Sequence, residues 1–142
     1  MNYFKSDSDI ARIGEGVAYC TLPKSEWTHA AHFAAAFWLL STPDRDAFGE
    51  MPALIRAYNE STGVANTDSS GYHETITLAS LRAARAWLAQ SPAGTLCDRL
   101  NEFLASEYGR SDWLLAYWSR ALLFSVEARR AWVEPDIVRL PF

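Results

Sequence analysis

The sequence predicts an all-α fold: a single-domain helical bundle of five main helices over residues 1–142, with irregular segments at its N- and C-terminal ends. The first observation is that Gly and Pro residues divide the chain into segments of helical length. The second is that apolar residues recur at helical spacing within these segments, and no strand pair is evident. The third is size, because 142 residues with 49% hydrophobic side chains can bury one full core.

The N-terminal segment is expected to contain at most a short helix, from residue 7 to about residue 14. Gly14 and Gly16 lower the helix propensity at its end. Leu22 precedes Pro23, and a residue before proline favours extended backbone. We therefore expect an irregular beginning to the chain.

The next segment is expected to be the central helix of the fold. Ser25 is its predicted N-cap, Glu26 lies in a first turn that favours negative charge, and the helix ends at about Ser41. Between residues 30 and 40 the only polar residue is His32. A helix that is apolar on every side is normally buried on every side, so we expect this one at the centre.

Three more helices are expected in the middle of the chain. Capping residues mark their beginnings, and glycine or proline marks their ends. They are expected from residue 44 or 46 to residue 61 before Gly63, from residue 72 to about residue 90 before Pro92 and Gly94, and from the Thr95 cap to Gly109.

The last part of the chain is expected to hold one further main helix. Ser111 and Asp112 are its predicted caps, and apolar side chains recur at helical spacing from residue 113 to residue 123. Ser125 is expected to restart a short terminal helix. The tail beyond Trp132 is expected to pack as extended chain, because its apolar residues lack helical spacing.

Charge and composition argue against several classes of protein. The formal net charge of −4 is unlike the basic surface of a nucleic-acid binder. The longest apolar run, residues 33–40, is far shorter than the ~20 residues that span a bilayer, and the first residues lack an apolar signal core. Cys20 and Cys97 lack the spacing of a thiol zinc site or a disulfide framework. We expect a cytoplasmic monomer or small homo-oligomer with neither nucleic-acid nor membrane partners.

Three histidines, in two short motifs, mark the predicted functional site. His29 and His32 lie one turn apart on one helix face, with Cβ atoms ~5–6 Å apart, so both can reach one ion. His73 and Glu74 begin another helix and offer a third ligand. The pattern predicts a divalent metal, Zn, Fe or Mn, with coordination positions left open for water or substrate.

Two charged residues have predicted roles beside the histidines. Glu26, one turn before the pair, is expected to be a general base, a further metal ligand or an acceptor that orients an imidazole. Arg120 lies in an apolar stretch, where a buried cation needs a carboxylate partner. The alternatives for Arg120 are an ion pair with Glu26 or Glu74, another internal salt bridge, and a clamp on an anionic substrate.

The same residues also have structural interpretations. Glu74 suits a capping box with Gly71, and His32 suits a buried neutral imidazole bonded to a backbone carbonyl. Motifs of nucleotide-binding proteins, serine hydrolases and HExxH zinc enzymes are absent. The leading hypothesis is a metal-dependent hydrolase, lyase or oxygenase acting on a small anionic molecule. The alternatives are a metal-free small-ligand-binding protein and a purely structural or interaction protein.

Three motifs carry a resemblance to known sequences: EWTHAAH at residues 26–32, GYHET at residues 71–75 and VEPD at residues 133–136. They resemble a group of small bacterial helical proteins to which no activity is assigned. The resemblance covers most of the chain and implies a bacterial cytoplasmic protein, but it implies no reaction. A looser likeness to helical-bundle metal proteins with three histidines in a cleft is an analogy only.

Overall fold

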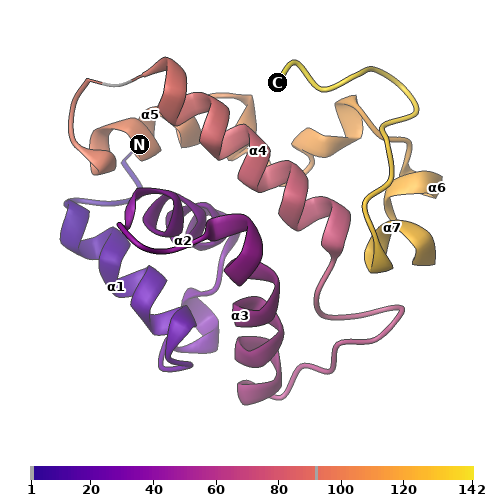
Figure 1. Ribbon diagram of the computed structural model, residues 1–142, viewed down its shortest axis with the longest axis horizontal. Coiled ribbons are helices and arrows are strands. Elements are labelled where there is room, and N and C mark those ends of the chain that lie inside the picture. The colour runs from indigo at the N-terminus through magenta and orange to yellow at the C-terminus, as the bar shows by residue number, and fades with distance from the viewer. Residues whose placement is uncertain (1, 92) are drawn as a thin grey trace.

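The computed structural model describes residues 2–91 and 93–142, which form helices, turns and irregular chain without strands (Figure 1). Met1 and Pro92, the latter an expected helix stop, lie outside the described residues. The all-α prediction is confirmed, and five helices in the described part have ten residues or more. They are α1 (Asp7–Ala18), α2 (His29–Ser41), α3 (Ala47–Ser61), α4 (Glu74–Gln90) and α5 (Leu96–Ala105).

α1 is one of the main helices, contrary to the short helix expected, because it continues through both glycines. A Cβ atom on Gly14 would collide with the Trp38 ring of α2, and one on Gly16 would press on Leu22. The glycines therefore let α1 approach its neighbours closely. Burial of the apolar face of α1 outweighs the ~0.5–1 kcal/mol that each helical glycine costs. That face consists of Ile10, Ile13 and Val17.

α2 lies at the centre of the fold and contacts α1, α3, α4 and α5, as its apolar pattern predicted. Its N-cap is Thr28 and not Ser25, because the Thr28 hydroxyl accepts a hydrogen bond from the backbone N–H of Ala31. The preceding residues form a separate 3₁₀ turn, η1 (Lys24–Glu26). Glu26 is therefore outside α2, and the expectation that it occupies the first turn of that helix is corrected.

The boundaries of α3 and α4 agree with the prediction to within three residues. Asp46 caps α3, and Gly63 follows its end with a φ of +84°, the left-handed conformation that glycine adopts readily. α4 begins at Glu74, two residues later than expected, because His73 occupies the N-cap position. The His73 imidazole replaces the usual hydroxyl or carboxylate as the capping acceptor.

Short turns and helices replace the long helices expected near the end of the chain. α5 stops at Ala105, and the predicted extension to Gly109 is a 3₁₀ turn. The single helix expected over residues 113–123 is also divided, because Ser119 caps a new helix at Leu122 N–H and Asp136 binds the backbone and hydroxyl of Ser119. The resulting elements are η2 (Glu107–Gly109), η3 (Trp113–Ala116), α6 (Arg120–Leu123) and α7 (Val126–Arg130).

The irregular tail packs back onto these short elements, as expected. The Trp118 indole donates a hydrogen bond to the carbonyl of Val133, with 3.1 Å between the atoms. Figure 1 shows α1, α2 and α3 on one side of α4, and α6, α7 and the tail on the other side, near the beginning of α4. The seam between these two groups of helices holds the candidate site.

Candidate functional site

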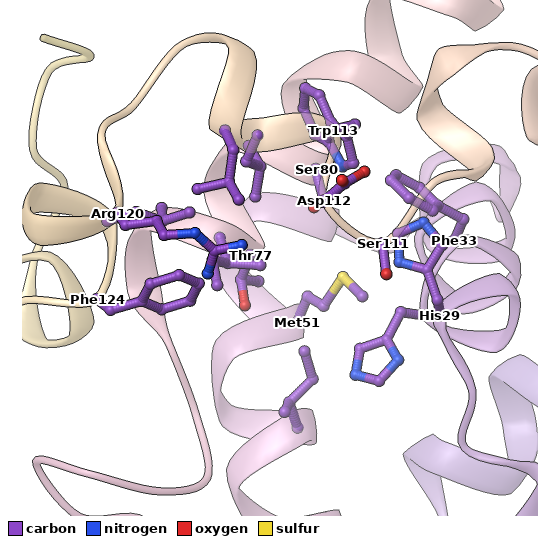
Figure 2. A pocket seen from close by; sticks show the side chains of 16 residues that line it. His29, Phe33, Met51, Thr77, Ser80, Ser111, Asp112, Trp113, Arg120 and Phe124 are labelled. Atoms are coloured by element: carbon purple, nitrogen blue, oxygen red, sulfur yellow. The ribbon is translucent and has the colours of Figure 1, made fainter.

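A pocket of about 440 Å³ opens between α2, α3, the first turns of α4 and residues 111–124 (Figure 2). Most of its exposed wall is apolar, although seven of the sixteen lining residues have polar or charged side chains. A volume of ~300–1,000 Å³ with such a lining is typical of small-molecule sites. Its apolar wall includes Phe33, Met51, Ile55, Ile76, Leu114 and Leu123.

His29 lines the pocket from the first residue of α2. Its Nε2 lies 2.9 Å from the backbone carbonyl oxygen of Tyr108. A carbonyl only accepts, so Nε2 carries the proton and donates it in this hydrogen bond. In the neutral ring Nδ1 is then an acceptor, and no described residue donates to it.

His32 lines the pocket one turn further along α2, with the opposite tautomer. Its Nδ1 donates to the backbone carbonyl of Thr28 at 2.7 Å, so Nε2 is the acceptor nitrogen. The ring also stacks on Trp27. Burial lowers the pKa of His32 to about 4, against a smaller opposing effect of the Thr28 hydrogen bond. The imidazole is therefore neutral at physiological pH, and its predicted bond to a backbone carbonyl is present.

Arg120 lines the pocket from the first residue of α6. Figure 2 shows its side chain extending toward Thr77, on the side of the pocket opposite His29. Asp112, the acidic residue of the lining, forms its ion pair with Arg110, whose hydrogen bonds lower the pKa of that carboxyl, and the charge of Arg120 lowers it further. Among the described residues no carboxylate forms an ion pair with Arg120, and the pairs considered with Glu26 and Glu74 are not formed.

His73 does not line the pocket, and both of its ring nitrogens are occupied. Nε2 donates to the carbonyl of Leu123 at 2.7 Å, and Nδ1 accepts from the backbone N–H of Ile76 at 3.2 Å. His73 is 7% exposed, and burial lowers the pKa of its ring. His73 thus holds the beginning of α4 against the end of α6, and it has no nitrogen left for a metal in this conformation.

Glu74 also lies outside the lining of the pocket. Its Oε1 accepts a hydrogen bond from the Tyr72 hydroxyl at 2.5 Å. Burial and this carboxylate raise the pKa of Tyr72, while the neighbouring Thr77 hydroxyl opposes the rise. Thr77 lines the pocket but Tyr72 and Glu74 do not, so the structure leaves Glu74 outside the site.

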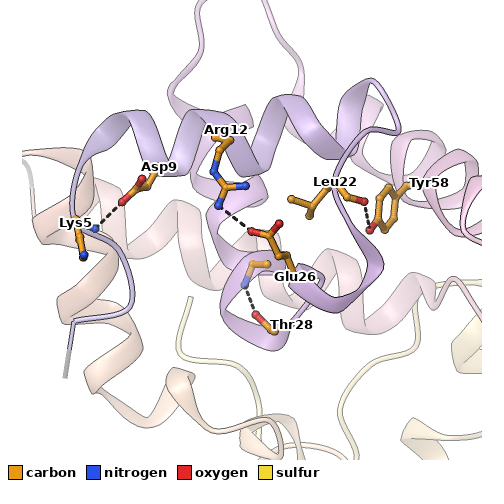
Figure 3. A network of polar contacts seen from close by, with 8 residues as sticks. Lys5, Asp9, Arg12, Leu22, Glu26, Thr28 and Tyr58 are labelled. Carbon is orange, nitrogen blue, oxygen red and sulfur yellow. Dashed lines mark hydrogen bonds and ion pairs between the residues drawn. The ribbon is translucent and has the colours of Figure 1, made fainter.

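Glu26 is bound to Arg12 on the other side of the α2 N-terminus, where the two side chains are 2.9 Å apart (Figure 3). Neither residue lines the pocket. In residues 2–91 and 93–142 no three His, Cys, Asp or Glu side chains are close enough to hold a metal ion. The structure thus brings together His29, His32 and Arg120 but not Glu26, His73 and Glu74, and metal binding stays a prediction.

Four polar residues of the lining were not predicted from the sequence. Thr77 and Ser80 lie one turn apart on α4, between apolar residues, and helical spacing from His73 could have indicated them. Ser111 and Asp112 were assigned to a helix cap alone. No comparable signal distinguishes these two, because their position depends on how the chain after α5 folds back over α2.

No family model, curated protein or solved structure matches the chain. None of the helices in the described part of the chain combines the length and apolar character needed to cross a membrane. The pocket residues therefore carry the functional evidence.

Proposed function

We propose that the protein binds a small molecule with an apolar body and one anionic group in the pocket between α2, α3, α4 and α6. The observation that carries the proposal is the position of Arg120. It is a permanent cation, exposed at the edge of an apolar pocket, and no carboxylate forms an ion pair with it among the described residues. A guanidinium binds carboxylate or phosphate through two parallel hydrogen bonds, which suits it to this role.

The neighbouring charges support an exogenous anion. Asp112 is the acidic residue of the lining, but Arg110 already binds both of its oxygens, at 3.1 and 3.2 Å. The three charges of Arg110, Asp112 and Arg120 leave one net positive charge at the pocket. An anionic group of the ligand would complete this arrangement, while the apolar wall would take up the rest of the molecule.

A second candidate is the divalent metal site of the sequence analysis, reduced to two protein ligands. Histidines that bind metals usually donate their other ring N–H to a carbonyl or carboxylate, which orients the ring. His29 and His32 both do so. Zn, Fe or Mn held there would take its remaining ligands from water or from the bound molecule, and a hydrolase, lyase or oxygenase activity would depend on it.

Thermal denaturation with a panel of small aryl and branched alkyl carboxylates and phosphates tests the first candidate. In buffer with EDTA, binding should raise the melting temperature of the wild type, and it should raise that of Arg120→Met much less. Arg139→Met is the control, because Arg139 is also exposed but lies outside this pocket, and its melting temperature should rise as in the wild type. Equal shifts in Arg120→Met, or no shift with any anion, would contradict the proposal.

The metal candidate has a separate test. Isothermal titration calorimetry with Co²⁺ or Zn²⁺ should show one binding site in the wild type and none in His29→Ala or His32→Ala. Binding that survives both substitutions, or no binding in the wild type, would contradict it.

A further inference from the structure

We propose that His29 and His32 select ligands that carry an N–H or O–H donor at the end opposite their anionic group. The ligand class is therefore an apolar acid with a distal hydroxyl or amino group, such as a hydroxyaryl or aminoaryl alkanoic acid. This inference rests on the proposed function, because it assumes that Arg120 takes the anionic group. It adds the chemistry of the other end of the molecule.

The histidine hydrogen bonds have a fixed direction. Both rings donate to backbone carbonyls, His29 to Tyr108 and His32 to Thr28. A carbonyl cannot reverse its role, so neither ring can exchange tautomers without losing a bond of 2.7–2.9 Å. Two acceptor nitrogens remain, Nδ1 of His29 and Nε2 of His32, both on residues of the pocket lining.

These nitrogens have no internal donor among the described residues. The lining holds hydroxyl groups on Thr77, Ser80 and Ser111, and no hydrogen bond joins any of them to either histidine within the described residues. Water can satisfy both nitrogens while the pocket is open. A ligand that displaces this water must offer a donor, because a covered acceptor without a partner weakens binding by about tenfold or more.

The two polar ends of the pocket lie apart. Figure 2 shows Arg120 and Phe124 on one side of the pocket and His29 and Phe33 on the other, with Met51 between them. His32 follows one turn after His29 on α2. A ligand that reaches both ends therefore has its anionic group at Arg120, its apolar body against Met51 and its donor at the histidines.

Three closely related acids test the inference in wild-type protein. The probes are 3-(4-hydroxyphenyl)propionate, its 4-methoxy analogue, which has an oxygen but no donor, and 3-phenylpropionate. Isothermal titration at pH 7.5 with EDTA should show the hydroxy acid binding at least about tenfold more tightly than either analogue. Equal affinities of the three acids would overturn the inference.

Two variants assign the selectivity to its residues. In His32→Leu the ratio of affinities that favours the hydroxy acid should shrink toward one, since one acceptor is gone. Arg120→Met should instead weaken the binding of all three acids by a similar factor and leave that ratio unchanged. A preference unchanged in both His32→Leu and His29→Leu would overturn the inference.

The outcomes separate this inference from the proposed function. If all three acids bind equally and Arg120→Met weakens them, the anion site stands and the histidine selectivity fails. If none of the three acids binds while other anions of the panel still raise the melting temperature, this inference fails alone. If no anion of the panel binds, or Arg120→Met has no effect, the proposed function itself fails.

Discussion

The Trp27 indole lies flat on the His32 imidazole, with 3.6 Å between the ring centroids and 26° between the ring planes. The stack covers one face of the imidazole beside the pocket, while Thr28 holds its Nδ1. The arrangement keeps the ring neutral and leaves Nε2 as its acceptor.

This stack predicts an unusual titration. The His32 ring should protonate with a midpoint at about pH 4 in the folded protein, which NMR of the ring protons measures directly. Trp27→Ala should move the midpoint upward, because desolvation costs the charged ring ~3 kcal/mol, more than the ~0.5–1 kcal/mol that a cation–π contact returns. A midpoint near 6.5 in the wild type would contradict the prediction.

The same shift predicts how stability depends on pH. Because the pKa of His32 is lower in the folded protein than its ordinary 6.5, the unfolded chain binds more protons at acidic pH. The stability from this ring is complete above about pH 6.5 and is lost as the pH falls toward about 4. Urea denaturation should show a loss of ~2 kcal/mol between pH 7 and pH 5.

His32→Gln is the control for this pH dependence. It removes the ring, so the slope between pH 7 and pH 5 should become shallower. The lowered pKa of His73 acts in the same direction, and part of the slope should remain. An identical slope in His32→Gln would assign the pH dependence to other groups.

His73 is expected to act on stability and not on ligand binding. His73→Ala removes the cap of Ile76 N–H and leaves the Leu123 carbonyl without its donor, which should cost about 2–4 kcal/mol in urea denaturation. His73→Asn keeps a capping oxygen and should cost less. Folded His73→Asn should bind anionic ligands like the wild type, and a selective loss of binding would indicate a direct role in the site.

Gly14→Ala should destabilise the protein, although an alanine in place of a glycine normally stabilises a helix. Propensity alone predicts stabilisation of about 1 kcal/mol. The added methyl group would instead overlap the Trp38 ring, so we expect destabilisation of about 1–3 kcal/mol. Repeating the substitution in a Trp38→Leu background should reduce the cost, and stabilisation in the wild-type background would disprove the close contact.

Asp136 is expected to position Arg120 from outside the pocket. Its carboxylate accepts from the Ser119 backbone at 2.7 Å and from the Ser119 hydroxyl at 2.6 Å, immediately before α6 begins. Asp136→Ala should speed hydrogen exchange at the amides of α6. It should also weaken the binding of anionic ligands, but by less than Arg120→Met does. Unchanged exchange and unchanged affinity would show that α6 holds its position without this contact.

Local patterns predicted the fold class and the centre of the molecule. The all-apolar stretch before Ser41 becomes the buried α2, and Asp46 and Gly63 delimit α3 as capping rules require. The length of α1 could not be predicted, because it depends on Trp38 lying against Gly14. The division of the last predicted helix depends likewise on Asp136, a partner distant in sequence.

The candidate site was predicted in part. Helical spacing alone placed His29 and His32 on one face, and both line the pocket with Arg120. His73 was grouped with them because both motifs begin helices, but its side chain turns into its own helix end and toward Leu123. Spacing along a sequence does not show which way a capping side chain points.

The pocket is also a gap in the apolar packing between α3 and α6. Met51 and Leu123 line it from opposite groups of helices, and no residue in the described part of the chain fills the space between them. A bound molecule would therefore supply contacts that a continuous core would otherwise provide. The short C-terminal helices should resist proteases better when the site is filled, so ligands could be sought by their protection of the chain after Gly109.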